Sequence, residues 1–203
     1  MDEKVPCSKC GAFILTSTAS KTNGLCMPCK GGYRQRMEAA KKLNQEEREK
    51  DRTDPFRELW LSLVHQVHDS STGFGGLSHP EKLYFAVGCL EGDVYNGGFH
   101  QYFFNDAGSY YALAEEGLKA IGAFHTLELL KSAKEVLFAS EAVPVNTIER
   151  RRMLPHYPES HAEKCAWSAE LDELDKRYWK DSEAISERMK TFARECRLVT
   201  NAE

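Results

Sequence analysis

Residues 7–29 read Cys7-Ser-Lys-Cys10-Gly-Ala-Phe-Ile-Leu-Thr-Ser-Thr-Ala-Ser-Lys-Thr-Asn-Gly-Leu-Cys26-Met-Pro-Cys29, so two Cys-x-x-Cys pairs stand fifteen residues apart. Cysteines three positions apart can turn both sulfurs toward one point, and two such turns supply the four ligands of a tetrahedral Zn²⁺ at about 2.3 Å. Because four thiolates leave no open coordination position, we expect a structural ion. The spacing predicts one zinc ion held by Cys7, Cys10, Cys26 and Cys29.

The segment around these cysteines is too short to bury a core of its own. The metal must therefore supply its folding free energy, on the order of 10 kcal/mol. Residues 12–15 can form a strand, and Asn23-Gly24 favours a hairpin turn just before the second pair. The alternative is a redox dithiol, which is typical of a single Cys-x-x-Cys in a βαβ context that this segment does not have. We predict a zinc-ribbon-like module with a small β-hairpin over residues 1–32.

The composition is that of a protein with a buried core. Of 203 residues, 41% are hydrophobic and 29% are charged, and the apolar runs fall well short of the ~20 residues that cross a bilayer. The first residues contain no apolar signal region. We therefore expect a cytoplasmic protein without membrane contact, whose cysteines are reduced. The cysteines beyond the module are expected to be small core residues: Cys89, Cys165 and Cys196.

Charge is distributed unevenly along the chain. Residues 1–52 hold 11 Lys and Arg against 7 Asp and Glu, whereas residues 53–203 hold 16 against 24. Residues 33–53 consist of strong helix formers with almost no apolar stripe, which predicts a charged linker helix. An alternative is that the basic front of the chain binds nucleic acid through phosphate contacts from Arg34, Arg36, Lys41 and Lys42.

The remainder, residues 54–198, shows the period of amphipathic helices and no clear period-two alternation. Pro55 opens a helix with one broad apolar stripe, and Ser78 with Glu81 forms a capping-box pattern for the next helix. Further apolar stripes predict helices as far as Cys196. Residues 141–160 contain three prolines and are predicted to be a loop with at most one helical turn. The predicted fold is mainly α, a helical domain preceded by a small zinc ribbon with a β-hairpin.

Residues 91–105, Glu-Gly-Asp-Val-Tyr-Asn-Gly-Gly-Phe-His-Gln-Tyr-Phe-Phe-Asn, are the most distinctive stretch of this domain. Asn96 can cap a helix, while Gly97 and Gly98 permit backbone angles or close approaches that other residues do not. One interpretation is a tight helix corner locked into the core by aromatic side chains. The other is a polar pocket formed by Asn96, His100, Gln101 and Asn105.

The same stretch resembles the bacterial DNA-mimic protein family, a helical domain of unknown function. The residues that carry the resemblance are Val94, Tyr95, Asn96, Gly97, Gly98, Phe99, Gln101, Tyr102, Phe103 and Asn105. The likeness continues at residues 120–123, returns at residues 171–178 and covers roughly residues 55–195. The cysteine module is also similar to one that precedes this domain in some members. The resemblance implies an all-helical fold, homodimerisation and no established enzymatic activity.

The resemblance also implies a kind of partner. One branch of the family imitates duplex DNA with acidic side chains and thereby occupies DNA-binding proteins. The chain departs from that branch in its modest net charge of −8 over residues 53–203 and in the run Arg150-Arg151-Arg152. Four carboxylates would form the mimic surface: Glu170, Asp172, Glu173 and Asp175. The alternative is that they are ordinary solvated side chains of the protein surface.

Motifs of catalysis are absent from the sequence. It contains no Gly-x-Ser-x-Gly, no phosphate-binding glycine loop and no His-Glu-x-x-His. Packing or surface positions are expected for His65, His68, His156 and His161. We therefore predict a non-catalytic zinc-binding protein whose helical domain binds another protein, as a regulator of a DNA-binding protein. The alternatives are nucleic-acid binding through residues 1–52 and an enzyme with a pocket at residues 96–105.

Overall fold

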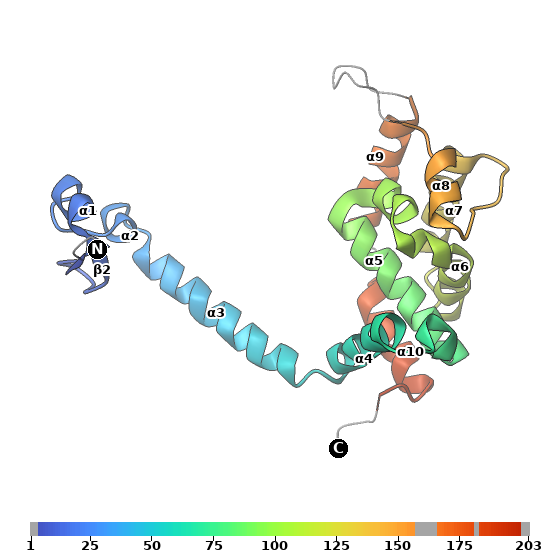
Figure 1. Cartoon of the computed structure of the whole chain (residues 1–203), viewed down its shortest axis with the longest axis horizontal. Coiled ribbons are helices and arrows are strands. Elements are labelled where there is room, and N and C mark those ends of the chain that lie inside the picture. The colour runs from blue at the N-terminus through green and yellow to red at the C-terminus, as the bar shows by residue number, and fades with distance from the viewer. Residues whose placement is uncertain (1–3, 157–165, 181–182, 200–203) are drawn as a thin grey trace. The chain divides into compact units, whose positions relative to one another are not determined.

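The computed structural model describes residues 4–156, 166–180 and 183–199, apart from the side chains of residues 50 and 51 (Figure 1). The chain divides into two compact units, Met1–Asp54 and Pro55–Glu203. Helices dominate, and a two-stranded antiparallel sheet lies near the N-terminus, so the predicted fold class is confirmed. Cys165 and His161 lie outside the described residues.

The first unit is built around the cysteine pairs. Strands β1 (Lys4–Pro6) and β2 (Phe13–Leu15) pair antiparallel, with Val5 opposite Ile14. The connection between them contains the first cysteine pair and Gly11, whose φ of 72° suits a residue without a side chain. Helices α1 (Thr16–Lys21), α2 (Met27–Lys30) and the longer α3 (Arg34–Arg52) follow.

The Asn23-Gly24 pair does not turn a hairpin, so that prediction was wrong. The hairpin folds at the first cysteine pair instead, because strand residues stand on both sides of it. Asn23 and Gly24 end α1, where both have positive φ, 54° and 78°. The Gly24 N–H donates to Ala19 O at 2.9 Å, and the reversed chain then leads Cys26 back to the first pair.

The second unit is organised around one long helix, α5 (His79–Phe104), which contacts each of the six other α-helices among its described residues. These are α4 (Pro55–Asp69), α6 (Tyr111–Ala120), α7 (Phe124–Phe138), α8 (Thr147–Met153), α9 (Ala166–Tyr178) and α10 (Ile185–Glu195), with short 3-10 turns at η1 (Gly73–Gly76) and η2 (Asp106–Tyr110). The predicted capping box is confirmed, because the Ser78 N–H donates to Glu81 Oε2 at 2.7 Å. Leu90, Val94 and Phe99 of α5 are fully buried, as expected of a central helix.

Helix α8 lies where the sequence predicted a loop with at most one turn. Asn146 starts this helix, because its Oδ1 accepts the N–H of Ile148 at 2.9 Å and of Glu149 at 3.1 Å. The arginine run belongs to α8. Arg150 is 0% exposed and therefore adds no positive charge to the surface, while Arg151 is exposed.

Candidate functional site

The four cysteines of the first unit come together in space. Their Sγ atoms all lie within 4.8 Å of one another, and Cys10 Sγ is 3.7 Å from Cys26 Sγ. A tetrahedral ion with metal–sulfur bonds of about 2.3 Å requires sulfur atoms about 3.8 Å apart. The quartet therefore has dimensions at which it could hold one metal ion.

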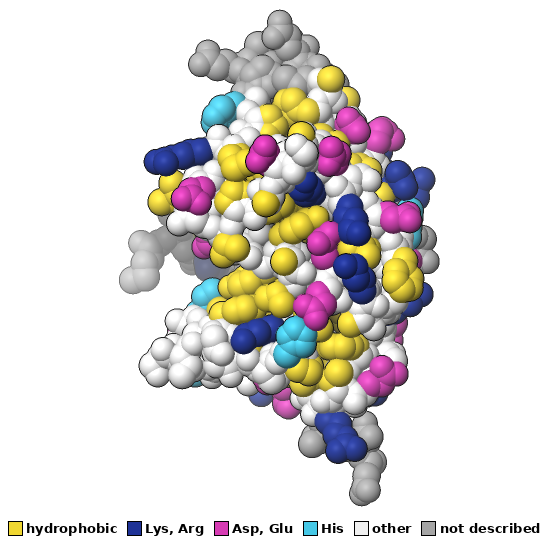
Figure 2. Space-filling view, turned by 90° about the vertical axis from the view of Figure 1, so that its right-hand side faces the viewer, with side chains coloured by type: hydrophobic (Ala, Val, Ile, Leu, Met, Phe, Trp, Pro, Cys, Tyr) yellow, Lys and Arg dark blue, Asp and Glu magenta, His cyan; other side chains and the backbone are white. Residues whose placement is uncertain are grey.

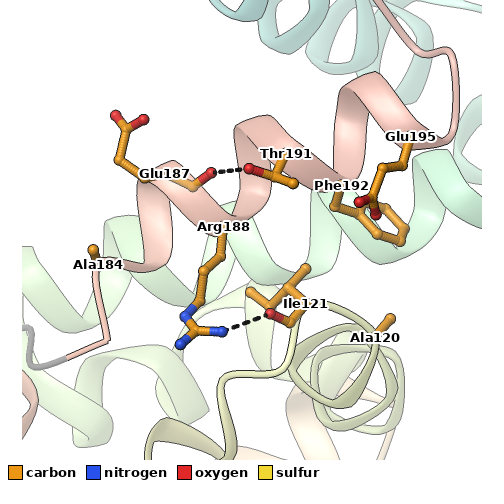
Figure 3. Close-up of a pocket in the computed structure, with 8 residues that line it drawn as sticks. All are labelled: Ala120, Ile121, Ala184, Glu187, Arg188, Thr191, Phe192 and Glu195. Atoms are coloured by element: carbon orange, nitrogen blue, oxygen red, sulfur yellow. Dashed lines mark hydrogen bonds between the residues drawn. The ribbon is translucent and has the colours of Figure 1, made fainter.

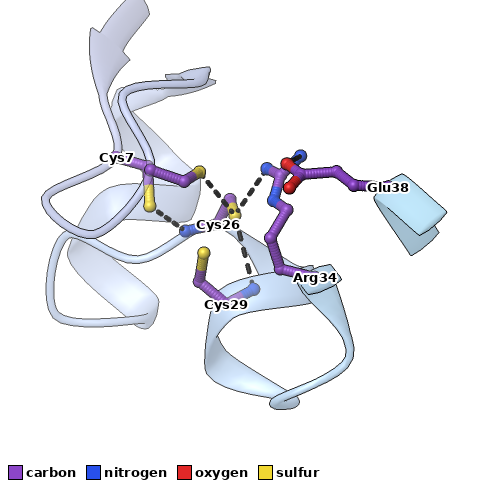
Figure 4. Close-up of polar contacts among 6 residues, drawn as sticks. Cys7, Cys26, Cys29, Arg34 and Glu38 are labelled. Atoms are coloured by element: carbon purple, nitrogen blue, oxygen red, sulfur yellow. Dashed lines mark hydrogen bonds and ion pairs between the residues drawn. The ribbon is translucent and has the colours of Figure 1, made fainter. Parts of the chain in front are cut away.

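Hydrogen-bond donors surround the sulfur atoms (Figure 4). The Cys26 N–H donates to Cys7 Sγ at 3.2 Å, and the Cys29 N–H donates to Cys26 Sγ at 3.4 Å. Arg34 Nη2 donates to Cys26 Sγ at 3.0 Å. Four thiolates carry more negative charge than one divalent ion neutralises, so these donors offset the excess.

The thiols of the quartet differ in how readily they ionise. The hydrogen bond from the Cys26 N–H lowers the pKa of Cys7 to about 6. Burial opposes ionisation of Cys26, but the hydrogen bonds from Arg34 and from the Cys29 amide prevail and lower its pKa. Burial raises the pKa of Cys29 to about 12. One cysteine of each pair therefore favours the thiolate, the form that binds metal.

Arg34 was predicted to contact phosphates of a nucleic acid, but its side chain is half-buried and bonded within the protein. Arg34 opens α3 and reaches back to the cysteine quartet, while its guanidinium also pairs with Glu38 at 3.6 Å. The hydrogen bond to Cys26 raises the pKa of Arg34 still further, so the cation is permanent. Sequence reasoning missed this role. The signal that could have found it is a basic residue at the start of the helix that follows the last cysteine.

The Asn-Gly-Gly-Phe segment forms a break inside α5. Gly97 (φ −161°, ψ 23°) and Gly98 (φ 77°, ψ −179°) leave the helical conformation, and a second helical half begins at Phe99. The positive φ at Gly98 strains any residue with a side chain. A Cβ at Gly98 would also lie 2.1 Å from Asp175 Oδ2, so the missing side chain lets that carboxylate reach the backbone of α5.

Charged side chains from α8 and α9 cap both ends of this second half. Asp175 of α9 accepts the Phe99 N–H at 2.8 Å. At the other end, Arg150 of α8 donates to Phe103 O at 2.7 Å and to Asn105 O at 2.6 Å. An anion at a helix N-terminus and a cation at its C-terminus both complement the helix dipole. We call residues 97–105 with Asp175 and Arg150 the α5 joint, because α8 and α9 are fastened to α5 there.

Asp175 differs from Glu170, Asp172 and Glu173, the other carboxylates that would form the mimic surface. It is only 9% exposed, and burial raises its pKa although the Phe99 N–H acts in the opposite direction. Its carboxylate is used inside the fold, so the expectation that it belongs to an interaction surface was wrong. Glu170, Asp172 and Glu173 are exposed on the same helix.

The polar residues of the motif form hydrogen bonds and ring contacts within the domain. Asp93 Oδ1 accepts from Gln101 Nε2 at 3.1 Å and from Asn105 Nδ2 at 2.8 Å. The His100 ring stacks on Trp167, with centroids 5.7 Å apart. Asn96 is exposed, whereas Phe99 and Tyr102 are fully buried. This arrangement supports the interpretation as a helix corner rather than a pocket.

A hollow of about 460 Å³ lies elsewhere in the second unit, where α10 meets the end of α6 (Figure 3). Its charged centre, Arg188, donates to Ile121 O and Gly122 O, each at 3.2 Å. The described residues that line it include no cysteine or histidine: Ala120, Ile121, Ala184, Glu187, Arg188, Thr191, Phe192 and Glu195.

Comparison with known proteins identifies the helical domain. The family described as DMP19-like protein matches residues 75–196, which run from η1 to the end of α10 and include the α5 joint. The chain belongs to the DMP19-like protein family. This confirms, for the helical domain, the resemblance to DNA-mimic proteins.

Besides the family match, there is a short similarity to a protein of another length. Over 38 residues the chain is 53% identical to a protein of Salmonella typhimurium (strain LT2) named "Uncharacterized protein YpfL". That match covers 17% of this chain and 9% of the Salmonella protein, so the chain spans only a small part of it. No solved structure matches the chain. Among the described residues, no helix has both the length and the apolar character needed to cross a membrane.

Proposed function

We propose that this DMP19-like protein is a non-catalytic zinc-binding protein whose helical domain binds a DNA-binding protein and regulates it. The observation that carries the proposal is family membership over residues 75–196. The internal hydrogen bonds of the α5 joint argue against the enzyme alternative, because the polar groups that a pocket would need are already engaged.

The contact surface that we propose is the exposed side of α9. Leu171, Leu174 and Tyr178 turn into the core, as Asp175 does, so Glu170, Asp172 and Glu173 lie on the outer side of this helix. DNA-binding proteins use Lys and Arg to bind phosphates, and exposed carboxylates can attract the same cations. The face that covers α6, α7 and α8 mixes acidic, basic and hydrophobic side chains (Figure 2).

The fold holds α9 in a defined position. Besides the hydrogen bond that the Phe99 N–H donates to Asp175, Trp179 Nε1 donates to Val94 O at 3.0 Å. The Phe99 and Tyr178 rings meet edge to face, with centroids 5.5 Å apart. A helix fastened at these points presents its carboxylates with little loss of conformational entropy on binding.

For the first unit we propose one structural Zn²⁺. Soft thiolate ligands suit zinc, and the four sulfur atoms lie within 4.8 Å of one another, with Cys10 and Cys26 at 3.7 Å. With all four positions occupied by protein ligands, the ion would stabilise the fold and would not activate water.

The proposal can be tested with immobilised full-length protein and a bacterial extract enriched in heparin-binding proteins. We expect it to retain a DNA-binding protein that duplex DNA displaces. A triple variant, Glu170→Gln, Asp172→Asn and Glu173→Gln, should bind that protein at least tenfold more weakly. The matched control Glu128→Gln, Glu135→Gln and Glu141→Gln removes three exposed carboxylates elsewhere and should bind normally. Equal binding by both triple variants, or no competition by DNA, would contradict the proposal.

A further inference from the structure

We propose that the first unit binds single-stranded nucleic acid, with basic side chains on the phosphates and exposed aromatic rings on the bases. This inference goes beyond the function proposed above, because it concerns the other unit and a different kind of partner. It rests on the charge, the exposure and the local packing of residues 4–42.

Basic side chains dominate the surface of residues 4–42. The stretch holds eight Lys and Arg and a single acid, Glu38. Counting four thiolates and one divalent ion leaves a formal charge of about +5. Arg34 donates to Cys26 Sγ, and Lys42 pairs with Glu46 at 3.7 Å. The other six are exposed and pair with no acid among the described side chains: Lys4, Lys9, Lys21, Lys30, Arg36 and Lys41.

Tyr33 provides an aromatic ring in the middle of this basic stretch. It is 44% exposed and stands between α2 and α3. A Cβ at Gly31 would lie 2.4 Å from Tyr33 Cε1 and 2.7 Å from Cδ1, so the ring packs closely against the bare backbone of Gly31. The Tyr33 N–H donates to Pro28 O at 3.1 Å, which ties its main chain to the second cysteine pair. A ring held in this way loses little freedom when a base stacks on it.

Phe13 provides a second ring, on the hairpin. It is 73% exposed and lies opposite Pro6, while Lys4 lies opposite Leu15. Residues directly opposite each other in an antiparallel pair share a face, and so do alternate residues of one strand. Lys4 and Phe13 therefore lie on the same outer face of the hairpin. Ile14 instead packs against the buried cysteines. The exposed ring therefore has no role in the small core of this unit.

The combination of cations and exposed rings favours a single strand over other partners. A duplex offers phosphates but hides the faces of its bases, so Tyr33 and Phe13 would have nothing to stack on. A protein partner would fit an apolar patch, whereas here the two rings are accompanied by six unpaired cations. A single strand offers phosphates and unstacked bases together, and surfaces of this composition bind it with little sequence preference.

The test is fluorescence anisotropy of the full-length, zinc-loaded protein with a labelled oligothymidylate of about twelve nucleotides at low salt. Tyr33→Ala and Phe13→Ala should each weaken binding about tenfold, while Tyr33→Phe, which keeps the ring, should bind like the wild type. Lys30→Ala should reduce the slope of log K against log salt by about 0.7. The control Lys119→Ala, an exposed lysine of α6, should leave the slope unchanged.

An abasic strand of equal length separates stacking from charge and should bind at least tenfold more weakly. Equal binding of the abasic strand, or unchanged affinity in both alanine variants, would overturn the proposal, because cations alone would then explain the attraction. Absence of binding at 50 mM salt would overturn it as well and would favour a protein partner for these rings. Zinc content is measured for every variant, and if Tyr33→Ala loses metal, the more exposed Phe13 decides the question.

Discussion

The two units of this chain are stabilised by different means. In the first, the buried cluster consists of Cys7, Cys26 and Cys29, with Ile14 and Leu25 packed against them. In the second, a large apolar core surrounds α5. The contacts of the first unit join residues close in sequence, whereas the bond between Phe99 and Asp175 joins residues 76 positions apart. Local spacing therefore predicts the grouping of the cysteines in the first unit, and long-range packing decides the second unit.

Removal of the metal is expected to have the largest effect and to separate the two units. Cys26→Ser, or a zinc chelator, should unfold residues 4–33, because metal binding supplies on the order of 10 kcal/mol. Amide hydrogen exchange should show lost protection there and unchanged protection in α5. Cys196→Ser, a half-buried cysteine of the second unit, is the control and should retain the metal. Protection of residues 4–33 that survives chelation would remove the contrast between the units.

Arg150→Met should destabilise the second unit by on the order of 3 kcal/mol, because it leaves buried carbonyl groups without a donor. The fully buried guanidinium donates to the carbonyls of Phe103, Asn105, Pro144 and Val145 and to the hydroxyls of Ser109 and Thr147. Urea denaturation measures the free energy of unfolding. Arg152→Met, at an exposed position of the same helix, should change it by less than about 0.5 kcal/mol. Similar effects of the two substitutions would show that α8 does not depend on its buried cation.

Gly98→Ala should cost about 2 kcal/mol, since it strains a residue at φ 77° and pushes Asp175 away from the Phe99 N–H. Gly92→Ala is the matched substitution in the same helix, where a Cβ meets nothing within 4 Å. It should be neutral or stabilise the helix by up to about 1 kcal/mol. Thermal unfolding of both variants gives the comparison. Equal melting temperatures would mean that the α5 joint tolerates a side chain.

Glu183→Gln should have the smallest effect and one that depends on pH. The Glu183 carboxylate accepts the N–H groups of His125 and Thr126, at 3.1 Å and 2.8 Å, and so caps the start of α7. Burial opposes its ionisation, but these hydrogen bonds prevail and lower its pKa. The ionised group therefore stabilises the fold above its unfolded pKa of about 4.5, and this contribution is lost as the pH falls through the folded value.

Urea denaturation from pH 7 to pH 3 measures this dependence. At pH 7 the glutamine variant should be less stable by about 1 kcal/mol, and its difference from the wild type should shrink at acid pH. Glu195→Gln, at an exposed position of α10, should show no such trend. A difference that stays constant with pH would mean that the charge of Glu183 does not matter to the cap.

The elements predicted correctly are those with a local cause. Pro55 at a helix start and the capping box of Ser78 and Glu81 are read from neighbouring residues, and both helices begin there. Helix α8 was not predicted because residues 141–160 contain three prolines, which indicate a loop. Its cap, Asn146, lies in this stretch. The sequence placed a hairpin turn at Asn23-Gly24. Both residues have the positive φ that such a turn needs, but they follow helix α1 and do not connect two strands.

By itself, the sequence determined the helical class of the protein, the break at Gly97 and Gly98 and the grouping of four cysteines, because each depends on residues near one another in the chain. Only the tertiary structure decided that Asp175 and Arg150 are buried caps of α5 and that Arg34 donates a hydrogen bond to the cysteine quartet. The sequence does not show whether a carboxylate or a guanidinium is hydrogen-bonded to water or to a distant backbone group. That partner is chosen only when helices far apart in the chain pack together.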